Sequence, residues 1–146
     1  MLLRPMWIIQ KENKPMTRPL MEVTCAVIME GDRVLAAQRS ESMAHPLKWE
    51  FPGGKLRTGE HPEGCIIREI REELGVEISV IQLLPTVSHV YSDQPVKLIP
   101  FVCRIREGTI RLSEHRTFRW VPRDELDQVD WLEADVEVVS LINLYC

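Results

Sequence analysis

This sequence lacks the features that mark several common protein classes. Its four cysteines and four histidines form neither a CxxC nor an HxxxH pair, so their spacing indicates no zinc site and no redox motif. No apolar run approaches the roughly 20 residues that a membrane-spanning helix needs. Acidic residues outnumber basic ones, and the net charge of −4 argues against a polymeric nucleic acid or an anionic membrane as partner.

The composition is that of one ordinary globular domain. With 146 residues, of which 45% are hydrophobic and 27% charged, the chain is long enough to bury a core and too apolar to stay disordered. Most of the cysteines stand among apolar neighbours. We therefore expect buried, reduced thiols in a cytoplasmic protein at Cys25, Cys65, Cys103 and Cys146.

The first 20 residues differ from the rest of the chain. They contain one short apolar cluster, Met6–Ile9, and they lack the long apolar region and small-residue cleavage site of a signal peptide. We expect residues 1–20 to be an extension before a domain formed by residues 21–146. The sequence leaves open whether Met16 or Met21 is the natural first residue.

Strands and helices are mixed along the chain in a way that is typical of an α/β fold. Apolar and β-branched runs predict strands at residues 22–30, 34–40, 76–92 and 96–107, with shorter ones at 109–112 and 118–121. Gly31 and Asp32 predict a turn that joins the first two strands in a hairpin. A short helix is expected in residues 122–129 and a terminal helix in residues 132–146.

The clearest helix covers residues 61–74. Pro62 suits its first turn, Glu63 suits the positive end of the helix dipole, and Gly75 is a suitable terminator. Apolar residues at helical spacing predict the buried face of this helix, which is formed by Cys65, Ile66, Ile70 and Leu74.

Four acidic residues gather at this helix, and their charges need an explanation. Glu69, Glu72 and Glu73 lie on about one face, opposite the apolar stripe, and Glu60 stands just before the helix. Like charges at this spacing repel each other. If these acids lack matching cations, a bound divalent cation such as Mg²⁺ would remove the repulsion. The alternative is a solvated helix face in which Arg68 forms an ordinary ion pair with Glu72.

The residues around the helix form a longer pattern. It consists of Gly54, five residues, Glu60, seven residues, and then REIREELGV at residues 68–76. Every fixed position resembles the Nudix box, G-x5-E-x7-R-E-U-x-E-E-x-G-U, in which U is a bulky aliphatic residue. The stretch AQRSESMAHPLKWEFPGGK at residues 37–55 resembles the MutT-like branch of this family, which includes 8-oxo-dGTP diphosphatases and CTP pyrophosphohydrolases.

The resemblance implies a Nudix-type α/β/α sandwich, with a mixed β-sheet between helices. It also implies hydrolysis of a nucleoside diphosphate linked to another group, with Mg²⁺ or Mn²⁺ as cofactor. By position in the box, the metal would be held by the Gly53 carbonyl, Glu69, Glu72 and Glu73. Glu60 would support the metal shell, and Arg68 would orient these acids because its planar fork suits carboxylates.

A later acid matches the family in its distance from a tryptophan. Glu114 stands six residues before Trp120, as does a loop glutamate in MutT-like members. By this resemblance Glu114 would be a metal ligand or the base that activates water, a task for which Glu69 is the other candidate. The alternative is a solvated loop acid.

The resemblance implies nucleotide contacts for a second group, formed by Arg39, Glu50, Phe51, Pro52, Gly53, Lys55 and Asp135. Asp135 falls where relatives read the base edge, and capping of the last helix is a second role compatible with the first. Lys55 would contact a phosphate or only cover apolar surface. Trp49 and Phe51 suit a core or a pocket wall better than a stacking platform.

The resemblance thus predicts hydrolysis of a nucleoside triphosphate to the monophosphate and pyrophosphate, by a monomer or a homodimer. One alternative is a Nudix enzyme that acts on a sugar nucleotide or a dinucleotide. Another is a non-catalytic Nudix domain that binds a nucleotide or a protein partner. All the box glutamates are present, which favours catalysis, and the choice between an oxidised purine and a cytidine nucleotide is left open.

Overall fold

The computed structural model describes residues 18–146. Most of the predicted extension, residues 1–17, therefore lies outside the described residues, and the first strand begins at Met21. The elements are β1 (Met21–Glu30), β2 (Arg33–Gln38), β3 (Trp49–Glu50), β4 (Gly53–Lys55), α2 (Pro62–Leu74), β5 (Glu77–Leu83), β6 (Val87–Tyr91), β7 (Gln94–Glu107), β8 (Thr117–Pro122), the 3-10 helix η1 (Arg123–Gln128) and α3 (Glu133–Tyr145).

The strands form a mixed sheet around β1. Its order is β3-β2-β1-β7-β5, and β4, β6 and β8 pair with β1, β7 and β2, respectively. β1 runs parallel to β7, whereas the pairs that β1 forms with β2 and β4 are antiparallel. The predicted hairpin at Gly31 is confirmed, since Glu30 pairs with Arg33. β4 leaves the sheet directly into the loop that leads to α2, which brings this helix to the sheet.

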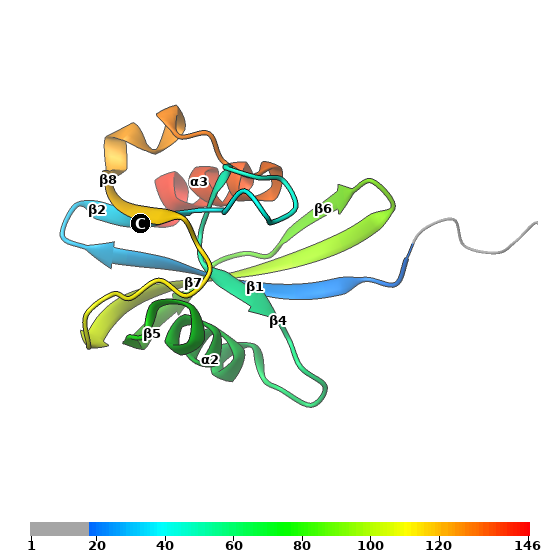
Figure 1. Cartoon of the computed structure of the whole chain (residues 1–146), viewed down its shortest axis with the longest axis horizontal. Coiled ribbons are helices and arrows are strands. Elements are labelled where there is room, and N and C mark those ends of the chain that lie inside the picture. Colours follow the sequence, from blue (N-terminus) through cyan, green and yellow to red (C-terminus); the bar gives the residue numbers. More distant parts are fainter. Residues whose placement is uncertain (1–17) are drawn as a thin grey trace, which may run out of the picture.

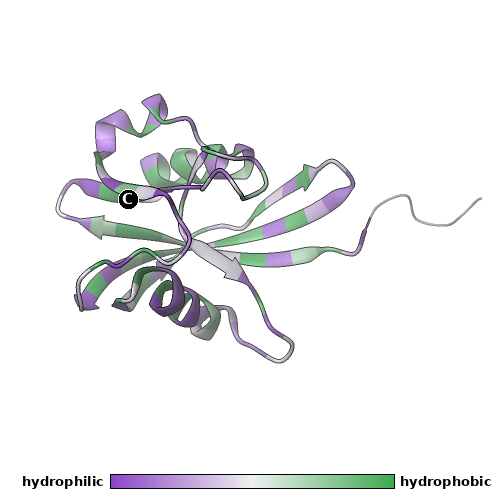
Figure 2. Cartoon of the chain, in the orientation of Figure 1, coloured by the Kyte–Doolittle hydropathy of each residue, from purple (hydrophilic) through white to green (hydrophobic). Residues whose placement is uncertain are grey.

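Both faces of β1 are buried because α2 and α3 lie on opposite sides of the sheet (Figure 1). Successive side chains of a strand point to opposite faces. Accordingly, Val27 belongs to the core that contains Ile142 of α3, and Ile28 to the core that contains Ile70 of α2. Figure 2 shows hydrophobic residues along the strands between the two helices. The predicted α/β/α sandwich with a mixed sheet is confirmed.

The helix predicted at residues 61–74 is α2, and its predicted buried face and terminating glycine are confirmed. The four residues of the predicted stripe are its buried residues, Cys65, Ile66, Ile70 and Leu74. Gly75 ends the helix in the left-handed region, with φ +67°, and its N–H donates to the carbonyl of Arg71. Among residues 18–146, no helix combines the length and the apolar character needed to cross a membrane.

The prediction of one continuous strand at residues 76–92 is wrong. The structure divides it into β5 and β6, which pair with different parts of β7, at 101–107 and 94–98. Pro85 lies at the break, where it lacks an N–H for the ladder. The preceding N–H, of Leu84, donates to the carbonyl of Pro100 at 2.9 Å.

The short strand predicted at residues 109–112 is also wrong. These residues form a loop that begins after Gly108, whose φ is +104°. The N–H of Arg111 donates to the carbonyl of Leu74 at 2.8 Å, so the loop bonds to the end of α2 instead of to a neighbouring strand. This attachment carries the following residues, 113–116, past the acidic face of α2.

All four cysteines are free, and Cys25, Cys65 and Cys103 are buried as expected. Cys146 is only half-buried, because it lies at the end of α3, where the helix runs out toward solvent.

Two neighbouring residues of α3 provide a test of the core. Ile142 is fully buried, whereas Leu144 is 77% exposed. We expect Ile142→Ala to lower the free energy of unfolding by about 2–5 kcal/mol, because it removes buried methyl groups and leaves a cavity. The control, Leu144→Ala, should change it by less than about 0.5 kcal/mol. Urea unfolding measures both, and equal losses would contradict the assignment of the buried face.

Candidate active site

The acids of α2 lie on the side of the helix away from the core, but they differ in exposure. The Glu69 side chain is 16% exposed, and that of Glu72 is 49% exposed. Glu73 is half-buried, one helical turn after Glu69. Exposure therefore decreases across this face of the helix. Glu72 lies in solvent, whereas Glu73 lines a cavity.

Arg68 binds three of the four acids, so these three have a matching cation within the protein. Its Nε and Nη2 donate to the two oxygens of Glu60 at 2.7 and 2.9 Å. Its Nη1 donates to Glu69 at 2.8 Å and to Glu72 at 3.2 Å. The hydrogen bond from Arg68, followed by one from the Arg57 N–H, lowers the pKa of Glu60 to about 2.

Glu73 is the acid that receives no such help. Burial, and then the charges of Glu50 and Glu69, raise its pKa to about 9, against the effect of the Gly53 N–H. Its buried Oε2 finds no hydrogen-bond partner among the described residues. An unpaired buried carboxylate is costly, so in the absence of a cation this group holds a proton.

Two glycines allow the sheet and the acidic helix to approach closely. A Cβ on Gly54 would lie 2.3 Å from the Glu69 carboxyl carbon, and one on Gly53 would lie 2.0 Å from the carbonyl oxygen of Thr24. Real Cβ atoms do not come so close, so any larger residue would displace either the carboxylate or β1. The box glycine therefore makes room for the Glu69 carboxylate.

A cavity of about 670 Å³ joins the two predicted groups of residues. Its lining includes eight of them: Arg39, Glu50, Phe51, Gly53, Lys55, Glu73, Glu114 and Asp135. Five others do not line it: Pro52, Glu60, Arg68, Glu69 and Glu72. Pro52 is buried, and the remaining four form the ion-pair cluster beside the cavity.

Glu114 reaches this cavity from the loop between β7 and β8, and it is exposed. The adjacent Ser113 N–H donates to the carbonyl of Glu73 at 3.1 Å, which ties the loop to the end of the acidic helix. Lys55 is likewise exposed at the edge of the cavity.

Asp135 lies on the far side of the cavity and does not cap α3, so the predicted capping role is wrong. The N-cap is Leu132, and no side chain caps the helix. Asp135 sits in the first turn, is 4% exposed, and accepts a hydrogen bond from the Phe51 N–H at 3.1 Å. Burial, reinforced by the charge of Glu50, raises the pKa of Asp135 well above its usual range. In its protonated form, which this shift favours, the carboxyl can donate as well as accept a hydrogen bond.

Of the two aromatic residues considered in the sequence, Phe51 forms part of the cavity wall. Phe51 is 3% exposed and stacks on Trp131, with ring centroids 4.4 Å apart. Trp49 is half-buried beneath the guanidinium of Arg119, 5.0 Å from the ring centroid. Phe51 lines the cavity and Trp49 does not, in line with a wall rather than a stacking platform.

Sequence reasoning missed His115, which the fold brings to Glu50 over 65 positions of sequence. Its Nε2 lies 2.7 Å from Glu50 Oε2, and Arg39 Nη1 donates to Glu50 Oε1 at 2.6 Å. Burial acts to raise the pKa of Glu50, but the bonds from His115 and Arg39 outweigh it and lower that pKa. The position of His115, directly after a candidate metal ligand, was the only signal in the sequence.

The residues fit a hard divalent cation, although their side chains do not yet surround one. Across residues 18–146, no three acidic, histidine or cysteine side chains are grouped closely enough to hold a metal ion as they lie. Arg68 accounts for this, because it occupies Glu69 and Glu72. The unpartnered oxygen of Glu73 and the all-carboxylate donor set suit Mg²⁺ or Mn²⁺ rather than a softer metal.

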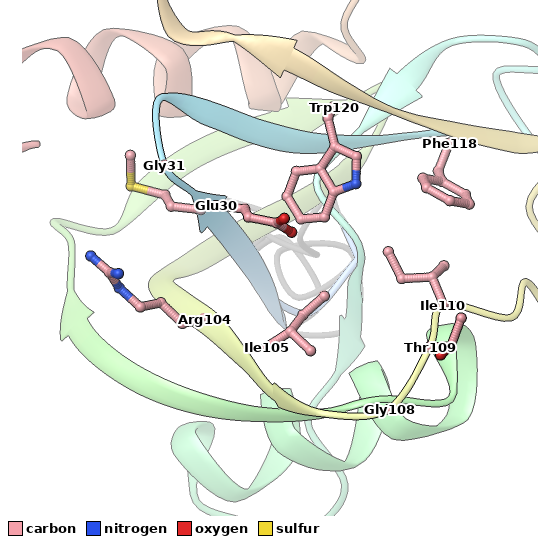
Figure 3. A pocket seen from close by; sticks show the side chains of 10 residues that line it. Glu30, Gly31, Arg104, Ile105, Gly108, Thr109, Ile110, Phe118 and Trp120 are labelled. Carbon is pink, nitrogen blue, oxygen red and sulfur yellow. The ribbon is translucent and has the colours of Figure 1, made fainter.

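A second pocket, of about 520 Å³, contains none of these residues. Figure 3 shows Phe118 and Trp120 on one side of it and Ile105 and Ile110 on the other. Its lining includes no predicted site residue, so the candidate active site is the first cavity.

Comparison with known proteins agrees with this arrangement. The family model of the NUDIX domain matches residues 19–141. The 8-oxo-dGTP diphosphatase of Proteus vulgaris is 36% identical over 108 residues, which cover 69% of this chain and 89% of that protein. The CTP pyrophosphohydrolase of Escherichia coli K12 is 29% identical over 121 residues, which cover 83% and 90%.

Among solved structures, the MutT protein of methicillin-resistant Staphylococcus aureus 252 superimposes with a TM-score of 0.72 and is 36% identical. The match covers 90% of this chain and 100% of that one. The family match spans both helices, the sheet and the acidic box. This chain therefore belongs to the NUDIX family, whose members with named activities among its relatives are hydrolases of phosphorus anhydrides.

Proposed function

We propose that this chain hydrolyses a nucleoside triphosphate, of the CTP, dCTP or 8-oxo-dGTP type, to the monophosphate and pyrophosphate. One observation carries the proposal: Glu73 and Glu114 line the same cavity as Phe51 and Asp135. Acids suited to a metal and residues suited to a nucleobase thus share one space of about 670 Å³, a size common for small-molecule sites.

The phosphates would lie at the acidic end of this cavity. Nudix hydrolases need a divalent metal ion, and Mg²⁺ or Mn²⁺ would be held by the Gly53 carbonyl, Glu69, Glu72, Glu73 and Glu114. Such an ion neutralises phosphate charge and lowers the pKa of bound water. The task of Arg68 and Glu60 is to hold Glu69 and Glu72 in place, and Glu73 would release its proton when the cation arrives.

The base that activates water would be Glu114 or Glu69. Glu114 is exposed at the cavity, where a water molecule has access to it. Glu69 gives one oxygen to Arg68, which favours a role as a ligand of fixed orientation. We therefore propose Glu114 as the base that activates water or as a further metal ligand.

The nucleobase would lie at the other end, against Phe51 and Asp135. A neutral Asp135 carboxyl can both donate and accept, so it can pair with a purine edge or with the amino group of a cytosine. Arg39 and Lys55 would complete the contacts to the nucleotide from the cavity lining. The similarity to an 8-oxo-dGTP diphosphatase and to a CTP pyrophosphohydrolase supports both classes of base.

The substrate is tested by pyrophosphate release with Mg²⁺ over a panel of nucleotides. The panel contains the normal NTPs and dNTPs, 8-oxo-dGTP, 5-methyl-dCTP and ADP-ribose. We expect turnover of a cytidine nucleotide or of 8-oxo-dGTP above the others. Turnover of ADP-ribose alone would keep the hydrolase and reject the triphosphate substrate, and no turnover would favour a binding domain.

Glu73→Gln tests the acidic end of the cavity. Glutamine keeps the shape of the neutral side chain but cannot become a carboxylate, so kcat should fall about 100-fold or more while the far-UV circular dichroism spectrum is kept. The matched control is Glu137→Gln, at an exposed position of α3, which should leave kcat unchanged. Unaltered turnover in Glu73→Gln would reject this residue as a metal ligand.

Magnesium should also stabilise the folded protein, because it binds carboxylates that only the fold brings together. At a concentration 100 times its Kd, the free energy of unfolding should rise by about 2.7 kcal/mol. Thermal melting with MgCl₂, compared with NaCl at equal ionic strength, measures the change. Glu73→Gln should show a much smaller rise, and equal rises in both proteins would count against the site.

A further inference from the structure

The side chain of His115 is buried although the residue lies in a surface loop. It lies in the loop at residues 108–116, between two exposed charged residues, Glu114 and Arg116. Its side chain is only 3% exposed. A polar ring is buried at a cost unless it is hydrogen-bonded, so this position calls for a partner that repays the cost.

That partner is Glu50, which both His115 and Arg39 hold. His115 Nε2 donates to Glu50 Oε2 at 2.7 Å, and Arg39 Nη1 donates to Oε1 at 2.6 Å. Arg39 Nε donates in turn to the carbonyl of Ala44 at 2.7 Å. Both oxygens of Glu50 are thus in use inside the protein, which leaves Glu50 better suited to hold other residues than to read a nucleobase.

The backbone around His115 is attached at two further points. The Ser113 N–H donates to the carbonyl of Glu73 at 3.1 Å, and the Arg116 N–H donates to the carbonyl of Gln38 at 2.9 Å. Between these two bonds, the His115 side chain is the buried anchor. Glu114 stands in the middle of this three-point attachment, is exposed, and lines the cavity.

We propose that His115 is a positioning residue, which fixes the Glu114 carboxylate against the acidic helix through its hydrogen bond to Glu50. The role of Glu114 in this inference rests on the proposed function, whereas the anchoring of the loop does not. Arg39, Glu50 and His115 then form a chain of hydrogen bonds that links the loop at residues 39–48 to the loop that carries Glu114.

The two nitrogens of His115 allow a matched pair of variants. Nδ1 is buried and has no hydrogen-bond partner among residues 18–146, so Nε2 is the nitrogen that carries the proposal. His115→Gln places an amide N–H near the position of Nε2 and can still reach Glu50. His115→Asn places its amide near Nδ1 and cannot, although it is as polar as glutamine.

Kinetics give the first test. We expect His115→Asn to lower kcat about 10- to 100-fold with KM changed less than about 3-fold, the usual cost of losing a residue that orients a ligand. His115→Gln should keep kcat within about 3-fold of the native value. In a Glu114→Gln background, His115→Asn should cause no further loss, because its effect passes through Glu114.

Equal losses in the asparagine and glutamine variants, or losses that multiply with Glu114→Gln, would overturn the proposal in favour of a general loss of stability. If His115→Asn does not fold, Glu50→Gln replaces it in the hydrogen-exchange measurement below, because it weakens the same hydrogen bond from the other side. Exchange at Ser113 and Arg116 should then accelerate, and unchanged exchange would overturn the proposal.

Amide hydrogen exchange gives a test that needs no activity. Exchange at Ser113 and Arg116 should accelerate at least about 10-fold in His115→Asn, and remain near the native rate in His115→Gln, since only the former releases the loop. Unchanged exchange in His115→Asn would overturn the anchoring. If the native protein turns over none of the nucleotides, the proposed function fails, while the exchange result still decides whether His115 anchors this loop.

Discussion

A single guanidinium, that of Arg68, holds the acidic part of this site together. It binds both oxygens of Glu60 and one oxygen each of Glu69 and Glu72, and it is only 16% exposed. A planar, permanently charged fork is the side chain that can hold several carboxylates in defined directions. Because Arg68 ties the loop before α2 to two turns of the helix, it also determines which acid remains unpaired. That acid is Glu73, which turns toward the cavity.

Three carboxyl groups of the cavity lining influence one another: Glu50, Glu73 and Asp135. Glu50 is held in its charged form by His115 and Arg39, against the effect of burial. Its charge then adds to burial in raising the pKa of Glu73 on one side and of Asp135 on the other. Two buried carboxyls can remain in one cavity because each can take a proton. Both carboxyls are thereby shifted toward the protonated form.

Local signals explain most of the predicted fold. The apolar stripe, Pro62 and Gly75 define α2 without reference to the rest of the chain, because spacing, ring geometry and left-handed φ are local properties. The break in residues 76–92 was missed because the apolar run continues through Leu84, which is buried and still bonds to Pro100 of β7. The chain leaves the sheet only after this residue, at Pro85. Residues 109–112 have the composition of a strand, yet the N–H of Arg111 donates to the carbonyl of Leu74 at the end of α2. Only tertiary contacts decide between these two arrangements.

The site divides in the same way. The sequence by itself determined the α/β class, the Nudix box and the face on which Glu69, Glu72 and Glu73 stand, since a helix converts spacing directly into direction. Only the tertiary structure decided which of these acids is paired and that Asp135 faces Phe51 instead of capping α3. It alone brought His115 to Glu50, 65 positions away. Ionisation and hydrogen bonding depend on burial and on neighbours distant in sequence, and these exist only once the two faces of the sheet are covered.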